Sequence, residues 1–255
     1  MAITIKNARE IEKMRQAGHA VSVCHQRVQA AIEPGISTAD LNDIVADTLK
    51  ELGATSNFLG HHGFPGVICA SVNDEIVHGI PGDRELAEGD IISVDIGAIV
   101  EGFHGDSAWT YPVGTISDAA ARLLQDTEDA LYAGIAVARG GNRIGAIGAA
   151  VEAFARPLGY GIVEGYGGHG IGRQMWEEPH IPNLGSPEHG PKMRPGMTLA
   201  IEPMLNLGDK ETRVLDDDWT VVTADGSWSA HFEHTVLITD GEAEILTKRL
   251  APVVD

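Results

Sequence analysis

The chain has 255 residues, 43% of them apolar, and a formal net charge of −19 from 37 acidic and 18 basic residues. This apolar content is enough for a packed core, so a disordered chain is excluded. The excess negative charge argues against broad binding to nucleic acid or to an anionic membrane, because both would repel it.

The amino-terminal region has no apolar stretch of the kind that directs secretion. No run in the chain approaches the roughly eighteen apolar residues of a transmembrane helix. Only Cys24 and Cys69 occur, and neither belongs to a CxxC pair. Because so few cysteines cannot form a disulfide framework, we expect a cytoplasmic protein in a reducing compartment.

Two amphipathic helices are predicted near the start of the chain. Apolar residues recur at three- and four-residue steps from Asn7 to Ala31, and Pro34 ends this pattern. Ser37 and Asp40 resemble a capping box for a second helix, which Gly53 terminates. Three strand-like runs follow, at residues 66–71, 91–99 and 107–113.

The same order of elements then returns. A helix is predicted from about Asp118 to Ala138, and another carries apolar residues from Ile144 to Leu158. The segments Gly35 to Gly53 and Gly141 to Gly159 have the same length, with apolar positions at a constant offset. This repetition indicates a duplication, although a coincidence between amphipathic helices is the alternative.

The predicted fold is therefore α+β, with helices on one face of a curved antiparallel sheet. We expect one domain over residues 1–255, built from two pseudo-symmetric halves of about 1–113 and 114–255, without an extra amino-terminal domain.

Two acidic residues are predicted to meet across a hairpin. Asp95 lies between apolar Val94 and Ile96, so strand alternation places its side chain on the face opposite theirs. Asp106 follows eleven residues later, at the start of the predicted returning strand. Either aspartate alone would more commonly be a turn residue, but two facing acids repel each other and call for a cation.

Three further candidates come from the second half. His169 lies in a glycine-rich loop, residues 165–172, where the backbone can approach another group closely. Glu202 closes an apolar run that is typical of a buried strand, and Glu233 interrupts another strand pattern. A single histidine in such a loop would usually be structural, but the other candidate ligands favour a metal-binding role for His169.

Together these residues form an oxygen-rich ligand set for divalent cations. Four carboxylates and one imidazole carry about four negative charges, which cannot be packed together without neutralising ions. Two ions that share bridging carboxylates satisfy such a set better than one, and ions about 3.5–4 Å apart are used for hydrolysis. The sequence thus predicts a two-metal hydrolase.

Other histidines are secondary candidates. His78 precedes a glycine and proline turn, where it could stay neutral and transfer a proton, or have no role. His104, His231 and His234 are candidates for outer partners of the ligands or for structural residues.

Several motifs in series resemble those of type I methionine aminopeptidases, over nearly the whole chain. They are Asn-Asp-Glu-Ile-Val-His-Gly-Ile-Pro at 73–81, Gly-Phe-His-Gly-Asp at 102–106, Gly-His-Gly-Ile-Gly at 168–172, Ile-Glu-Pro-Met at 201–204 and Glu-His-Thr at 233–235. The resemblance implies the pita-bread fold. It also implies a cytoplasmic, usually monomeric enzyme that removes the initiator methionine from nascent proteins when the second residue is small.

The resemblance further implies roles for the candidates. Asp95 and Asp106 would hold one ion, and Asp106, His169, Glu202 and Glu233 the other, with cobalt, manganese, iron or zinc as the metal. Glu202 would take a proton from the attacking water, and His78 would contact the scissile amide.

The methionine pocket implied by the resemblance consists of Phe58, His61, Phe64, Cys69, Met175 and Trp219, of which His61 replaces a more usual aromatic residue. A second departure is Trp176, which stands where the family usually has a substrate-contacting histidine. An indole N–H can donate one hydrogen bond but cannot carry a proton.

Two alternatives follow from these departures and from the shared ligands. One is a related peptidase that cleaves before proline, although such enzymes generally carry a long additional amino-terminal domain. The other is a catalytically weakened peptide-binding protein, against which the retention of all five acidic and histidine ligands argues.

Overall fold

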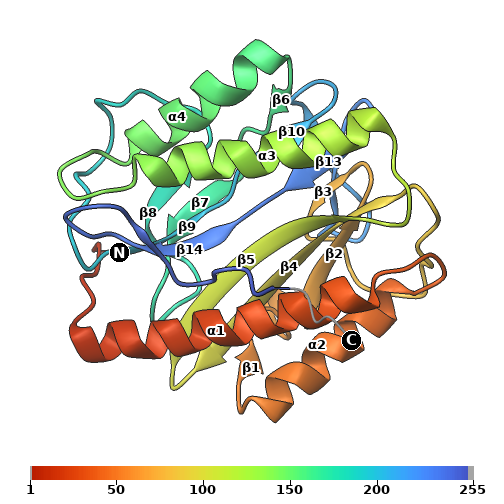
Figure 1. Ribbon diagram of the computed structural model, residues 1–255, viewed down its shortest axis with the longest axis horizontal. Helices are drawn as coiled ribbons and strands as arrows, with labels where there is room; N and C mark the ends of the chain where they lie inside the picture. Colours follow the sequence, from red (N-terminus) through yellow and green to blue (C-terminus); the bar gives the residue numbers. More distant parts are fainter. Residues whose placement is uncertain (1, 252–255) are drawn as a thin grey trace.

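The computed structural model describes residues 2–251 and combines helices with antiparallel strands, which confirms the predicted α+β class (Figure 1). The helices are α1 (Ala8–Ala31), α2 (Thr38–Glu51), α3 (Asp118–Ala136) and α4 (Gly145–Ala155), with short 3-10 turns at His61–Gly63 and Arg156–Leu158. No helix within the described residues is long and apolar enough to cross a membrane.

The strands of the first half are β1 (Thr55–Ser56), β2 (Ile68–Val72), β3 (Glu75–Val77), β4 (Ile91–Val100) and β5 (Phe103–Pro112). Those of the second half are β6 (Gly161–Ile162), β7 (Gly167–Gly170), β8 (Glu177–Pro182), β9 (Thr198–Ile201), β10 (Met204–Asn206), β11 (Thr212–Val214), β12 (Val221–Thr223), β13 (Ser229–His231), β14 (His234–Leu237) and β15 (Glu244–Ile245).

Both predicted helices of the first half are confirmed, together with their caps. The Asn7 side chain accepts from the first turn of α1, and Glu10 completes a capping box. Ser37 and Asp40 form the predicted box of α2. In the second half, α4 ends earlier than predicted, at Ala155, because Pro157 in the following turn has no N–H to continue the α-helical pattern.

The strands divide into four hydrogen-bonded sheets. Every pairing between named strands is antiparallel. The chain passes from β9 in the five-stranded sheet to β10 in a three-stranded sheet at Glu202 and Pro203, and proline cannot donate to a ladder. It passes back from β13 to β14 at Phe232 and Glu233.

The helices cover one face of the strands in both halves. Gly105 of β5 lies against α1, since a Cβ atom added there would be 2.9 Å from the Gly18 nitrogen. Tyr111 of β5 points the same way and its hydroxyl lies 3.0 Å from Nδ1 of His25. Alternation along β5 therefore directs Asp106 to the opposite face.

In the second half, α3 packs against α4 and β9 at Gly134. A Cβ atom at Gly134 would meet the side chains of Val151 and Ile147 in α4 at 3.2 and 3.3 Å, and that of Ile201 in β9 at 3.5 Å. Figure 1 shows the two helix pairs on either side of the long strands in this view. Since Ile201 faces the helices, the next residue, Glu202, is directed away from them. The duplication itself remains a prediction from the sequence.

Candidate active site

The β4–β5 hairpin carries Asp95 and Asp106, as predicted, but with a different register. Asp95 is paired with Ala108, and Asp106 with Gly97, so the two carboxylates are diagonal neighbours on one face. Asp106 also lies inside β5 and not at the start of the returning strand, because a tight turn with positive φ at 101 and 102 lets β5 begin at Phe103.

His169 lies in strand β7, so the expectation of a glycine-rich loop is wrong. The glycines instead permit close packing of strands: a Cβ atom at Gly168 would be 2.2 Å from the Ala200 oxygen, and one at Gly170 would be 2.3 Å from the Glu178 oxygen. His169 Nδ1 lies 2.9 Å from the Gly170 carbonyl, which can only accept. This contact fixes Nδ1 as a donor and leaves Nε2, which lies 3.7 Å from Glu202 Oε1, as the atom that can bind a metal.

Glu202 and Glu233 occupy the two positions where the chain changes sheets. The prediction that Glu202 ends a buried strand is confirmed, since β9 ends at Ile201. Glu233 lies between β13 and β14 and not within a strand. The Glu233 N–H donates to the Ala108 carbonyl at 2.8 Å, and the Ser107 hydroxyl donates to the Glu233 carbonyl at 2.6 Å. These bonds fix Glu233 against β5.

Three of the five predicted ligands converge closely. Donor atoms of Asp106, His169 and Glu233 all lie within 4.8 Å of one another. Glu202 adjoins them, with Oε1 3.7 Å from His169 Nε2. Buried oxygens of Asp95, Asp106 and Glu233 have no hydrogen-bond partner within the described part of the chain. Unpartnered buried carboxylate oxygens are costly, so this donor set fits divalent cations.

The charges of the site lead to the same conclusion. Burial, followed by the neighbouring carboxylates, raises the pKa of Asp106 and Glu233 well above the usual range. Burial likewise raises the pKa of Asp95 to about 7, although His231 opposes this rise. Burial also acts to raise the pKa of Glu202, but the imidazoles of His231 and His169 outweigh it and lower that pKa. Three of these four carboxylates are therefore disfavoured in their charged forms, which divalent cations would relieve.

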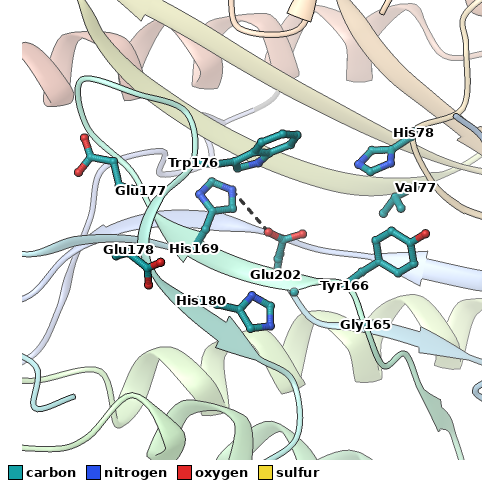
Figure 2. Close-up of a pocket in the computed structure, with 11 residues that line it drawn as sticks. Val77, His78, Gly165, Tyr166, His169, Trp176, Glu177, Glu178, His180 and Glu202 are labelled. Atoms are coloured by element: carbon teal, nitrogen blue, oxygen red, sulfur yellow. Dashed lines mark ion pairs between the residues drawn. The ribbon is translucent and has the colours of Figure 1, made fainter. Parts of the chain in front are cut away.

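A cavity of about 440 Å³ opens above these groups. Figure 2 shows His169 and Glu202 meeting below Trp176, with His78 and Tyr166 across the cavity from them. His78 has φ 61°, a left-handed conformation that is strained for a residue with a side chain and is common at functional sites. Burial lowers the pKa of His78, so its ring is neutral near pH 7.

An apolar cluster adjoins the acidic groups. It contains most of the predicted methionine pocket, namely Phe58, Phe64, Cys69 and Met175, with Trp219 packed against them. Cys69 of β2 is paired with Asp95 of β4, which joins the apolar wall directly to the carboxylates. The ring centroid of His61 lies 4.8 Å from that of Trp176.

Several cavity residues were not among the sequence candidates. Tyr166 and His180 both line the cavity, and His180 is paired with His169 across β7 and β8. The glycine-rich stretch around Tyr166 was a usable signal. His180 offered none, because its position depends on the pairing of two strands.

Comparison with known proteins gives consistent matches. Residues 12–240 match metallopeptidase family M24. The chain is 49% identical to methionine aminopeptidase 1 of Bacillus subtilis, over 96% of this chain and 99% of that protein. It is also 49% identical to methionine aminopeptidase 1 of Mycobacterium tuberculosis, over 95% and 94%.

Solved structures agree in fold. The methionine aminopeptidase of Thermotoga maritima superposes with a TM-score of 0.96 at 43% identity, covering 97% of this chain and all (100%) of that one. The prolidase of Pyrococcus furiosus gives a TM-score of 0.80 at 21% identity, covering 97% of this chain and 66% of that one, which shows a shared fold alone.

Proposed function

The chain belongs to metallopeptidase family M24, and from this premise we propose that it is a methionyl aminopeptidase. It removes the amino-terminal methionine from nascent proteins and peptides whose second residue is small. The observation that carries this proposal is the convergence of Asp106, His169 and Glu233 beside an apolar pocket. The relatives quoted above that are 43–49% identical over nearly the full chain are named methionine aminopeptidases.

Two divalent ions are proposed as cofactors, with cobalt, manganese, iron or zinc as the metal. Asp95 and Asp106 would hold one, and Asp106, His169, Glu202 and Glu233 would hold the other, with Asp106 and Glu233 shared between the two. The unpartnered buried oxygens of Asp95, Asp106 and Glu233 support this assignment, and so does the 3.7 Å contact between His169 Nε2 and Glu202 Oε1. When bound, such ions lower the pKa of water and polarise a carbonyl oxygen.

Two side chains of the cavity are proposed to handle protons and orient the peptide. Glu202, whose lowered pKa keeps it ionised, accepts a proton from water and returns it to the leaving amine. His78 is neutral and faces the cavity, where one ring nitrogen can bond to the scissile amide. The left-handed backbone of His78 fixes the direction of its ring.

The methionine side chain is proposed to enter the apolar cluster of Phe58, Phe64, Cys69 and Met175, closed by Trp219. Aromatic edges suit a thioether: the rings of Phe64 and Trp219 meet at 5.0 Å in an edge arrangement. His61 and Trp176 form the rim beside this cluster and contact the substrate backbone. Trp176 can donate from its indole N–H only.

The setting of the enzyme is also a proposal. We place it in the cytoplasm as a monomer, with at most a transient contact with the ribosome where nascent chains emerge. Cys24 and Cys69 are buried free thiols, which suits a reducing compartment.

Metal-dependent peptide release tests the function. Purified protein is stripped with a chelator, resupplied with Co²⁺, Mn²⁺ or Fe²⁺, and incubated with Met-Ala-Ser, Met-Lys-Ser and Leu-Pro-Ser. We expect methionine from the first peptide only, because a bulky second residue clashes at the rim. Release from Leu-Pro-Ser would instead identify a peptidase that cleaves before proline. Inertness with ions demonstrably bound would identify a peptide-binding protein.

A further inference from the structure

His231 is a buried histidine to which the proposed mechanism assigns no role. It is 2% exposed and ends strand β13, two residues before Glu233. Its backbone is fixed on both sides: its N–H donates to the Thr110 hydroxyl at 2.9 Å, and that hydroxyl donates to its carbonyl at 2.9 Å. Met204 of β10 is its strand partner. The ring is therefore presented from a rigid position.

The ring points at Glu202. Nε2 of His231 lies 3.5 Å from Glu202 Oε2, while Nε2 of His169 lies 3.7 Å from Glu202 Oε1. The carboxylate of Glu202 is thus held between two imidazoles, one at each oxygen.

The two imidazoles have different hydrogen-bonding environments. Nδ1 of His169 donates to the Gly170 carbonyl, which leaves Nε2 as the atom that can bind a metal. Nε2 of His231 is buried and has no hydrogen-bond partner within residues 2–251. A buried polar atom left unpaired costs about 1–3 kcal/mol, and Glu202 Oε2 is the acceptor within reach.

Direct ligation by His231 is less well supported. Its Nε2 lies 3.5 Å from Glu202 Oε2, so a hydrogen bond to this carboxylate already accounts for the direction of the ring. His231 contacts Oε2 of Glu202, whereas His169 contacts Oε1.

We propose that His231 is a positioning residue for Glu202: its Nε2–H donates to Oε2 and turns Oε1 toward the centre formed by Asp106, His169 and Glu233. This inference rests on the proposed function, since it assigns Glu202 to the ions and to the proton transfer. Groups that orient metal-binding carboxylates typically change metal affinity by about 10- to 100-fold when they are removed.

The test compares two substitutions of nearly equal size. His231→Gln keeps an N–H donor at the end of the side chain, whereas His231→Met does not. Co²⁺ itself is the probe: calorimetry gives its affinity, and the visible spectrum of the loaded protein reports ligand geometry. We expect His231→Met to bind Co²⁺ about 10- to 100-fold more weakly with an altered spectrum, and His231→Gln to stay close to the parent protein.

Equal affinities and spectra for the parent and both variants would overturn the inference. If His231→Met fails to fold by circular dichroism, a crystal structure of the Mn²⁺-loaded parent decides the question. It should show His231 Nε2 within about 2.7–3.2 Å of a Glu202 oxygen. A ring turned away from Glu202, or bound to an ion, would refute the positioning role.

The same experiment distinguishes a failure of the His231 role from a failure of the proposed function. A parent protein that binds Co²⁺ and releases methionine from Met-Ala-Ser, alongside variants that bind Co²⁺ equally well, removes only the role of His231. A parent protein that neither binds Co²⁺ nor releases methionine removes the proposed function.

Discussion

Asp95 and Asp106 lie diagonally across the β4–β5 hairpin, with Gly97 and not a side chain directly opposite Asp106. A Cβ atom at position 97 would come within 2.4 Å of the Asn57 amide nitrogen, so a larger residue does not fit there. The two carboxylates therefore share one crowded face without a side chain between them. Without cations, this arrangement costs the fold free energy, since burial and mutual repulsion both disfavour the charged forms.

Replacing Asp106 should have opposite effects on metal binding and on the stability of the metal-free protein. We expect Asp106→Asn to abolish Mn²⁺ binding and methionine release. In the presence of chelator, it should raise the free energy of unfolding at pH 8 by about 1–3 kcal/mol, because it removes a buried, repelled charge. Calorimetry with Mn²⁺ and urea denaturation measure the two effects. The exposed Asp216→Asn serves as control and should change neither; undiminished Mn²⁺ binding by Asp106→Asn would contradict the assignment.

Trp176 limits the rate in our proposal. Its ring centroid lies 6.4 Å from that of His169, and its side chain is 45% exposed at the cavity. Trp176→His should raise kcat for Met-Ala-Ser, by up to about 10²-fold, because an imidazole can also accept or carry a proton. Trp176→Phe, which keeps a ring without an N–H, should be slower than the parent. A slower Trp176→His variant would show that the indole is not a deficit.

The Lys6–Glu177 ion pair should matter more than surface pairs. The two side chains meet at 2.7 Å with 5% and 7% exposure, next to Trp176. Glu177→Gln leaves the Lys6 ammonium buried without its counter-charge and should lower the free energy of unfolding by about 3–5 kcal/mol. The matched control is Glu51→Gln, which breaks the exposed pair with Arg27 and should cost less than about 1 kcal/mol. Urea titrations at pH 7 compare them, and equal small losses would refute the prediction.

His25 should make the protein sensitive to acid. Burial lowers its pKa from 6.5 to about 3, so the folded protein keeps this ring neutral while the unfolded chain protonates it. The stabilisation is present above pH 6.5 and is lost as the pH falls toward 3. Between pH 6.5 and 4.5 the loss should be about 2 kcal/mol. We expect His25→Gln to show a correspondingly shallower fall in unfolding free energy, and an identical pH slope would count against it.

Local patterns were sufficient to predict the helices and the hairpin. Apolar periodicity and the Asn7 and Ser37 caps depend on neighbours within one or two turns, and the structure keeps them. The changes of sheet at Glu202 and Glu233 were not predicted, because the sheet that each strand joins depends on partner strands distant in the sequence. Pro203 was the one local sign, since proline interrupts a ladder.

Long-range pairing explains what the sequence left open at the site. The residues around His169 do not indicate a strand. Its neighbouring glycines allow close packing of β8 and β9, and this role is apparent only from the folded structure. The contact of His231 with Glu202 likewise depends on the pairing of β10 with β13. The acids themselves were recognisable, since an isolated carboxylate in an apolar strand pattern demands a partner wherever the strand lies.

Anomalous diffraction from crystals of the protein soaked in Mn²⁺ tests the central claim most directly. We predict two peaks about 3.5–4 Å apart, both contacted by Asp106 and Glu233, with Asp95 beside one and His169 and Glu202 beside the other. An absence of peaks between these side chains, with the carboxylates directed apart, would contradict the proposed metal centre.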